Sequence, residues 1–167
     1  ISQTNISGTS GKGKLEISHN SSNQFNIKTS NTTFKGIQGS GHNEIFTYSN
    51  DLNGNFNYIQ EQRALAVRFG GGHNFEIDNM DIVSSGNLKN IISGFSVDFY
   101  ILGVNGSTNG STTATLNGNS SITVDSPRTS AVFLASTGST QPIKFINKGT
   151  IKVRKGNAVE FMTNGNS

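Results

Sequence analysis

Short apolar clusters recur along the chain and are separated by runs of Gly, Asn, Ser and Thr. Within them, a small residue followed by Val, any residue and a large apolar residue occurs four times, at 66–69, 96–99, 131–134 and 158–161. Copies spaced 27 to 35 residues apart are typical of an array in which one unit stacks on the next. Each predicted unit holds three short apolar segments with turn residues between them, a pattern of β-strands.

The repeated motif also predicts which side chains are buried, because successive residues of a strand point to opposite faces. Val132 and Leu134 are expected to face the interior, whereas Ala131 and Phe133 face outward. Val97 occupies the corresponding inward position in the second copy. The outward position before the last residue differs in every copy, as expected of solvent-facing residues. Phe133 is therefore predicted to be an exposed aromatic residue.

These patterns predict an all-β, right-handed parallel β-helix (β-solenoid) of about five coils, each with 23–35 residues and three short strands. A β-sandwich or barrel with hairpins is the alternative, but it does not account for matching blocks of three strands. Residues 1–18 are expected to form an incomplete first coil or an N-terminal cap of one domain, taken from a longer protein. The predicted coils are 19–41, 42–72, 73–103, 104–138 and 139–167.

Composition favours β-structure and excludes several classes of site. Nearly half of the 167 residues are Ser, Thr, Asn or Gly, which disfavour helix interiors, while 11 Phe and low charge argue against disorder. The absence of cysteine excludes disulfides, thiolate metal sites and cysteine nucleophiles. The net charge of +3 is spread out except at Lys152, Arg154 and Lys155, so no nucleic-acid partner is expected. No apolar run reaches membrane-spanning length.

Two groups of residues are candidates for chemistry. His42 and His73 lie in Gly-His-Asn sequences one repeat apart, which suits either a metal site or a ladder of Asn turns, and the turn ladder is favoured. Glu76, Asp78 and Asp81 are the closest set of carboxylates, and glycoside hydrolysis requires such a pair. Glu76 and Asp78 flank an inward residue and are expected to face solvent. No catalytic residue, cofactor or metal is therefore predicted.

The predicted binding residues come from aromatic positions and from long loops. Aromatic residues at alternate positions in 45–59 either form outward stacking platforms or fill the interior. Loops 105–113 and 136–141 each follow the third strand of a predicted coil, so they are expected on one edge of the solenoid, where such proteins place contact loops. The candidate ligand-binding residues are Tyr48, Tyr58, Asn105, Asn109, Arg128 and Phe133.

One segment carries a family resemblance. Residues 147–153, followed by Gly156, Ala158, Val159 and Phe161, resemble the coils of passenger domains of bacterial type V autotransporters of the monomeric kind. The resemblance implies a monomeric passenger that is secreted and displayed at the bacterial cell surface. A membrane would be involved only through a C-terminal barrel outside this sequence.

The resemblance also implies a function. We expect a non-enzymatic adhesin or virulence factor segment that binds, or presents a tip that binds, a host-cell receptor or glycan. The alternative is a carbohydrate-active β-helix enzyme or a phage tailspike-like polysaccharide-binding protein.

Overall fold

A computed structural model of the chain describes residues 3–19, 25–35, 53–56, 59–60, 63–86, 90–92, 95–137 and 140–164. Within these ranges all regular elements are β-strands. A search of the same residues for a helix able to span a membrane found none. The strands are β1 (Gln3–Gly8), β2 (Gly13–His19), β3 (Phe25–Ser30), β4 (Thr32–Lys35), β5 (Asn53–Phe56), β6 (Ile59–Gln60), β7 (Arg63–Phe69), β8 (Asn74–Asp78), β9 (Met80–Ser85), β10 (Asn90–Ile92), β11 (Phe95–Asn105), β12 (Thr112–Leu116), β13 (Ser121–Thr137), β14 (Ile143–Asn147) and β15 (Thr150–Asn164).

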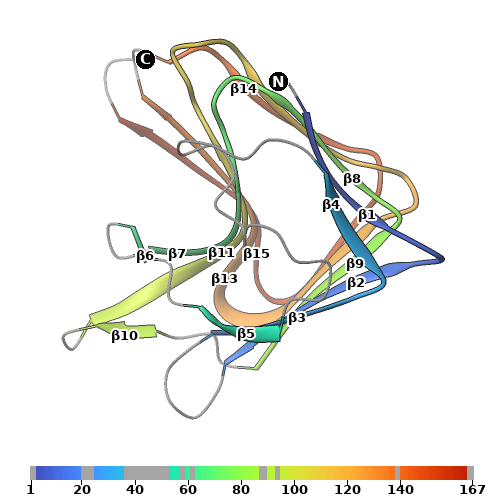
Figure 1. The fold of residues 1–167 in the computed structure, drawn as a ribbon. Helices are drawn as coiled ribbons and strands as arrows, with labels where there is room; N and C mark the ends of the chain where they lie inside the picture. The colour runs from blue at the N-terminus through green and yellow to red at the C-terminus, as the bar shows by residue number, and fades with distance from the viewer. Residues whose placement is uncertain are drawn as a thin grey trace.

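The strands form two mixed sheets around a common interior (Figure 1). The five-stranded sheet has the order β14-β12-β8-β1-β4, and only its β1–β4 pair is antiparallel. The ten-stranded sheet has the order β5-β3-β2-β9-β13-β11-β7-β6, with β10 beside β11 and β15 beside β13. The long strands β13 and β15 lie side by side and curve around the interior, so each contributes to two of its walls (Figure 1).

The predicted all-β class is confirmed, but the right-handed parallel β-helix of about five coils is wrong. Antiparallel pairs join β1 to β4, β2 to β3, β3 to β5, β6 to β7 and β10 to β11. Chain length between strands explains the antiparallel pairs between strands that follow each other directly. Only residues 20–24 separate β2 from β3, and only 61–62 separate β6 from β7. A parallel pair needs a crossover of a dozen or more residues, so such close neighbours pair as hairpins.

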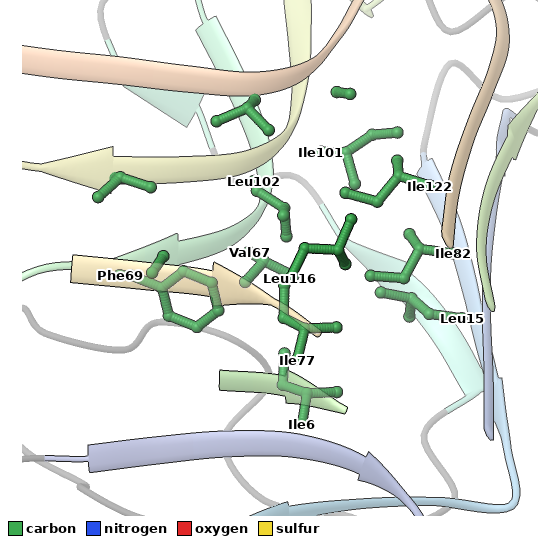
Figure 2. Packing of buried hydrophobic residues seen from close by; sticks show 14 of the residues in the cluster. Ile6, Leu15, Val67, Phe69, Ile77, Ile82, Ile101, Leu102, Leu116 and Ile122 are labelled. Carbon is green, nitrogen blue, oxygen red and sulfur yellow. The ribbon is translucent and has the colours of Figure 1, made fainter. Parts of the chain in front are cut away.

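Parallel pairing does join the strands that line the core, and it aligns apolar residues in rows across the sheets (Figure 2). In the smaller sheet Ile77 stands between Ile6 and Leu116 on the neighbouring strands, and all three are fully buried. The rows of the larger sheet are Leu15, Ile82 and Ile122; Val67, Leu102 and Val132; and Phe69, Val104 and Leu134. Burial of such apolar side chains is the main source of stability in this fold.

The repeated motif predicts the rows correctly at three of its four copies. Val67 and Val132 lie in one row, but the residue between them is Leu102 and not Val97. Val97 instead lies opposite Asn90 in the antiparallel β10–β11 pair. This local hairpin takes up the first part of β11, so the row continues five residues later. The place in this row that the motif predicts for Val97 is therefore taken by Leu102.

The alternation of buried and exposed residues breaks where β13 and β11 bend. Ala131, predicted to face outward, is fully buried beside the equally buried Val132. Ile101 and Leu102 of β11 are buried together in the same way. Two consecutive inward residues are possible because the strand changes from one wall of the interior to the next. The predicted inward positions of Val132 and Leu134 are confirmed.

Asparagine at the turns accounts for part of the unusual composition. Asn31 and Asn79 both have positive φ, at 49° and 54°, a region that asparagine tolerates better than most residues. The Asn31 side-chain oxygen accepts hydrogen bonds from the Thr9 hydroxyl at 2.6 Å and from the Ser10 backbone N–H at 3.1 Å. The Asn79 N–H donates to the side chain of Asn119, one layer away, at 2.8 Å. Asn side chains thus link successive turns.

Ser84 is a buried polar residue without a hydrogen-bond partner. It lies in a core row between Ile17 and Val124, is fully buried, and its hydroxyl makes no hydrogen bond. An unsatisfied buried hydroxyl costs on the order of 1–3 kcal/mol. We expect Ser84→Ala to raise the free energy of unfolding by about 1 kcal/mol, measured by urea denaturation. The exposed neighbour Ser85 gives the control, since Ser85→Ala should change little; a loss of stability in Ser84→Ala would contradict the expectation.

Candidate binding surface

The β7–β8, β11–β12 and β13–β14 connections meet at one edge of the molecule. We call this surface the loop corner, made of residues 70–73, 105–113, 135–136 and 140–142. Backbone hydrogen bonds link its layers: the Thr113 N–H donates to His73 O at 3.0 Å, and the Gly106 N–H donates to Ala135 O at 2.8 Å. The Gln141 N–H donates to Ser107 O at 2.8 Å. The predicted meeting of loops 105–113 and 136–141 on one edge is therefore observed for their described residues.

Side chains also hold the loop corner in shape. The Thr112 hydroxyl accepts a hydrogen bond from the Gly72 N–H at 3.1 Å, and the Ser107 hydroxyl accepts one from the Asn109 N–H at 3.0 Å. Ser136 and Thr140 share a hydroxyl–hydroxyl bond of 2.9 Å. These hydrogen bonds hold the loop backbone in place, and other polar side chains of the corner face solvent. The exposed polar side chains of the corner are Thr108, Asn109, Ser111 and Gln141.

Of the six predicted binding residues, the structure brings two together. Asn105 and Asn109 lie in the same loop of the corner, with Asn105 half-buried and Asn109 exposed. Arg128 is exposed and has a positive φ of 55° at the irregular bend of β13. The 129–134 segment of β13 separates that bend from the loop corner. Tyr48 and Tyr58 lie outside the described residues.

The expectation of an exposed Phe133 is wrong. Phe133 does point away from the main core, but it is only 4% exposed and stacks on Tyr100 with ring centroids 4.1 Å apart. The residue opposite Phe133 on β11 is Gly103, which has no side chain to occupy the space that the Phe133 ring needs. Ala135 and Met162 pack against the pair. An aromatic platform for sugar stacking is thus not available at Phe133.

A carboxylate completes this outer cluster. Glu160 lies opposite Phe133 on β15 and accepts hydrogen bonds from the Tyr100 hydroxyl at 3.2 Å and from the Ser130 hydroxyl at 3.0 Å. The outward position of the motif varies between copies, which indicates from sequence a residue that faces solvent without a fixed role. In the last copy Glu160 occupies this position and makes two hydrogen bonds. Its two bonds join β11, β13 and β15 on the outer side of the sheet.

Two of the three carboxylates that could serve catalysis, Asp78 and Asp81, contact neighbouring side chains. Asp78 accepts a hydrogen bond from the Asn117 side chain at 3.2 Å. Asp81 accepts one from the Ser121 hydroxyl at 2.6 Å and lies 3.4 Å from the Lys12 ammonium. Glu76 and Asp78 are half-buried on either side of the fully buried Ile77, which agrees with the predicted outward orientation. The contacts of Asp78 and Asp81 link neighbouring strands and the turns beside them.

Metal-binding groups do not gather in the part of the chain that the structure describes, where no three His, Asp or Glu residues are placed to hold an ion. His73 lies edge-on to Phe75, with ring centroids 6.3 Å apart, and its backbone carbonyl belongs to the loop corner. His42, its proposed partner in a turn ladder, lies outside the described residues.

Sequence reasoning did not single out the strongest apolar exposure of the described residues. Phe161 is 73% exposed, followed by Val159 at 39% and Val153 at 37%, and all three belong to β15. The motif placed Val159 and Phe161 correctly on the inward row. It carried no information on whether another strand covers that row, so the exposure could not be predicted.

Comparison of the chain with protein-family models, with curated proteins and with solved structures finds no match.

Proposed function

We propose that this protein is a non-enzymatic binding module of a bacterial surface adhesin, and that its loop corner contacts a glycan or a polar protein surface of a host cell. The observation that carries the proposal is the ordered loop corner itself. Three connections from different parts of the chain are joined by backbone hydrogen bonds, and their exposed side chains are amides and hydroxyls.

Ordered loops of this kind suit recognition of polar ligands. Amide and hydroxyl side chains both donate and accept hydrogen bonds, as sugar hydroxyls do. Holding Asn109 and its neighbours in place before binding reduces the conformational entropy that binding would otherwise remove. Loops supported by a rigid scaffold are also where proteins most often carry binding residues. A display role at the cell surface is proposed from the resemblance of residues 147–161 to autotransporter passenger coils.

The experiment compares binding by the unmodified chain and by a loop-corner variant, using a glycan array and cultured animal cells. Asn109→Lys adds a long charged side chain at an exposed position while leaving the Asn109 N–H bond to Ser107 possible. We expect the half-saturating concentration to rise about tenfold or more, the equivalent of about 1.4 kcal/mol.

Ser85→Lys is the matched control, because it introduces the same residue at an exposed site on β9. It should bind as the unmodified chain does. Equal binding by both lysine variants would contradict a role for the loop corner. Release of free sugar that disappears in Asp78→Ala would instead favour a carbohydrate-active enzyme.

A further inference from the structure

The same reactive dipeptide, Asn-Gly, occurs three times between the end of β11 and the start of β13. The three pairs are Asn105-Gly106, Asn109-Gly110 and Asn117-Gly118. Asparagine loses its side-chain amide readily before glycine, because glycine has no Cβ to shield the backbone nitrogen that attacks the asparagine side chain. The three pairs share this local chemistry, so the fold decides how their reactivities differ.

The fold protects the first pair at its attacking nitrogen. The Gly106 N–H donates a hydrogen bond to the Ala135 carbonyl oxygen at 2.8 Å, a bond that joins two layers of the loop corner. Asn105 is half-buried at the end of β11. The nitrogen must lose its proton before it can attack, so the bond to Ala135 has to break first. Reaction of this pair therefore requires a local opening of the loop corner.

The third pair is protected at its asparagine. The Asn117 side chain donates a hydrogen bond to an Asp78 carboxylate oxygen at 3.2 Å. The Asn117 N–H donates to Ile77 O at 2.9 Å, and the Asn117 carbonyl oxygen accepts a bond from the Ser120 N–H at 3.0 Å. Turning the side chain onto the Gly118 nitrogen would break the contact with Asp78 and strain this turn.

The second pair has neither protection. Asn109 is exposed, and within the described residues neither its side chain nor the Gly110 N–H makes a hydrogen bond. The bond from the Asn109 backbone N–H to the Ser107 hydroxyl uses neither of the reacting groups. A Cβ at position 72 would lie 2.8 Å from the Gly110 nitrogen, so glycine at this position leaves the nitrogen without a covering side chain.

We propose that Asn109-Gly110 is a self-modification site, at which the fold directs the conversion of Asn109 to isoaspartate and aspartate. The Gly110 nitrogen gives up its proton and bonds to the side-chain carbonyl carbon of Asn109. The bond from that carbon to the side-chain nitrogen breaks, ammonia leaves with the proton, and a succinimide ring results. Water then opens the ring. Cleavage of the original backbone C–N bond gives isoaspartate, and cleavage of the new C–N bond gives aspartate.

This reaction would change the character of the loop corner. The residues of the corner include no Asp, Glu, Lys or Arg, so the product carboxylate is the first acidic group there. Isoaspartate also lengthens the main chain by a methylene group in a loop that the Gly72–Thr112 and Ser107–Asn109 bonds hold in shape. We expect the conversion to weaken binding at the corner. Only this consequence rests on the proposed function.

The test incubates the folded protein in mildly alkaline water enriched in heavy oxygen and locates the products by tandem mass spectrometry of its peptides. We expect Asn109 to convert about tenfold or more faster than Asn105 or Asn117, a difference of about 1.4 kcal/mol in the activation barrier. The product should contain heavy oxygen, and the rate should rise with pH because the attacking nitrogen must lose its proton. No ligand takes part, so the result is independent of glycan binding.

The urea-unfolded chain is the control for local sequence. There the three pairs should convert at similar rates, because the bonds to Ala135 and Asp78 are lost. In the folded protein Asp78→Ala should speed conversion of Asn117 and leave the rate at Asn109 unchanged. Equal rates at the three pairs in the folded protein would overturn the proposal. A preference for Asn109 that persists in urea would also overturn it, because sequence and not the fold would then select the site.

Discussion

Replacing Ile77 by alanine is expected to lower the free energy of unfolding by about 2–5 kcal/mol. Ile77 is fully buried and lies in the middle of the five-stranded sheet, opposite Ile6 on one neighbour and Leu116 on the other. Regular backbone pairing on both sides limits how far the strands can move together, so most of the cavity should remain. A loss of this size is a large part of the 5–15 kcal/mol that is typical of a folded domain.

Two companion variants make the Ile77 result specific, each measured by urea denaturation. Ile77→Val removes one methylene group and should cost only about 0.5–1.5 kcal/mol. Asn74→Ala changes an exposed position on the same strand and should stay within about 0.5 kcal/mol of the unmodified chain. Similar stabilities for Ile77→Ala and Asn74→Ala would mean that β8 does not lie at the centre of the core.

Gly156→Ala is expected to destabilise the protein by about 2–3 kcal/mol. Gly156 lies on β15 beside the irregular bend of β13 and has a positive φ of 98°. A Cβ at this position would lie too close to the carbonyl oxygen of Thr129 and 2.7 Å from that of Ser126. Both obstacles are backbone atoms, so relieving them requires moving the bend itself.

A variant at Gly86 separates the cost of the positive φ from the cost of the close backbone contacts. Gly86 also has a positive φ, 78°, but a Cβ there would meet no atom within 4 Å. Gly86→Ala should therefore show only the conformational cost of the left-handed backbone, about 1–2 kcal/mol. Thermal unfolding of both variants gives the comparison. If the two alanine variants are equally stable, close packing at the β13–β15 bend contributes nothing beyond backbone conformation.

The local features of this fold could be predicted from sequence, but the pairing of distant strands could be predicted only in part. Alternation identified Val132 and Leu134 as buried, because the period of a strand is fixed by backbone geometry. The same alternation failed at Ala131, where the strand bends and two consecutive residues turn inward. Nothing in the four-residue motif distinguishes a bend from a straight strand.

The β-helix prediction failed for a related reason. Repeated apolar motifs indicate which residues share an interior, but they do not give the direction in which neighbouring strands run. The antiparallel β2–β3 pair follows from the short connection 20–24, and this length was available in the sequence. The choice of Leu102 over Val97 depends on the hairpin of β10 with β11, a competition that apolar pattern alone does not resolve.

The sequence predicts which loops meet at the candidate site, because this depends on the order of strands and loops along the chain. It does not predict the burial of side chains that depends on residues of other strands. Each loop follows the third strand of a predicted unit, so the meeting of loops 105–113 and 136–141 at one edge could be predicted. The burial of Phe133 could not, because it requires Tyr100 at its side and Gly103 opposite it. The exposure of Phe161 likewise reflects the absence of a covering strand among the described residues.

The most direct test of the binding function is a titration of the isotope-labelled protein, followed by nuclear magnetic resonance, with the glycan that binds best on the array. We expect backbone amide shifts to change mainly at residues 106–113 and 140–142, and the sugar to be recovered unaltered. Shift changes centred on Glu76, Asp78 and Asp81, together with cleavage of the glycan, would contradict this expectation.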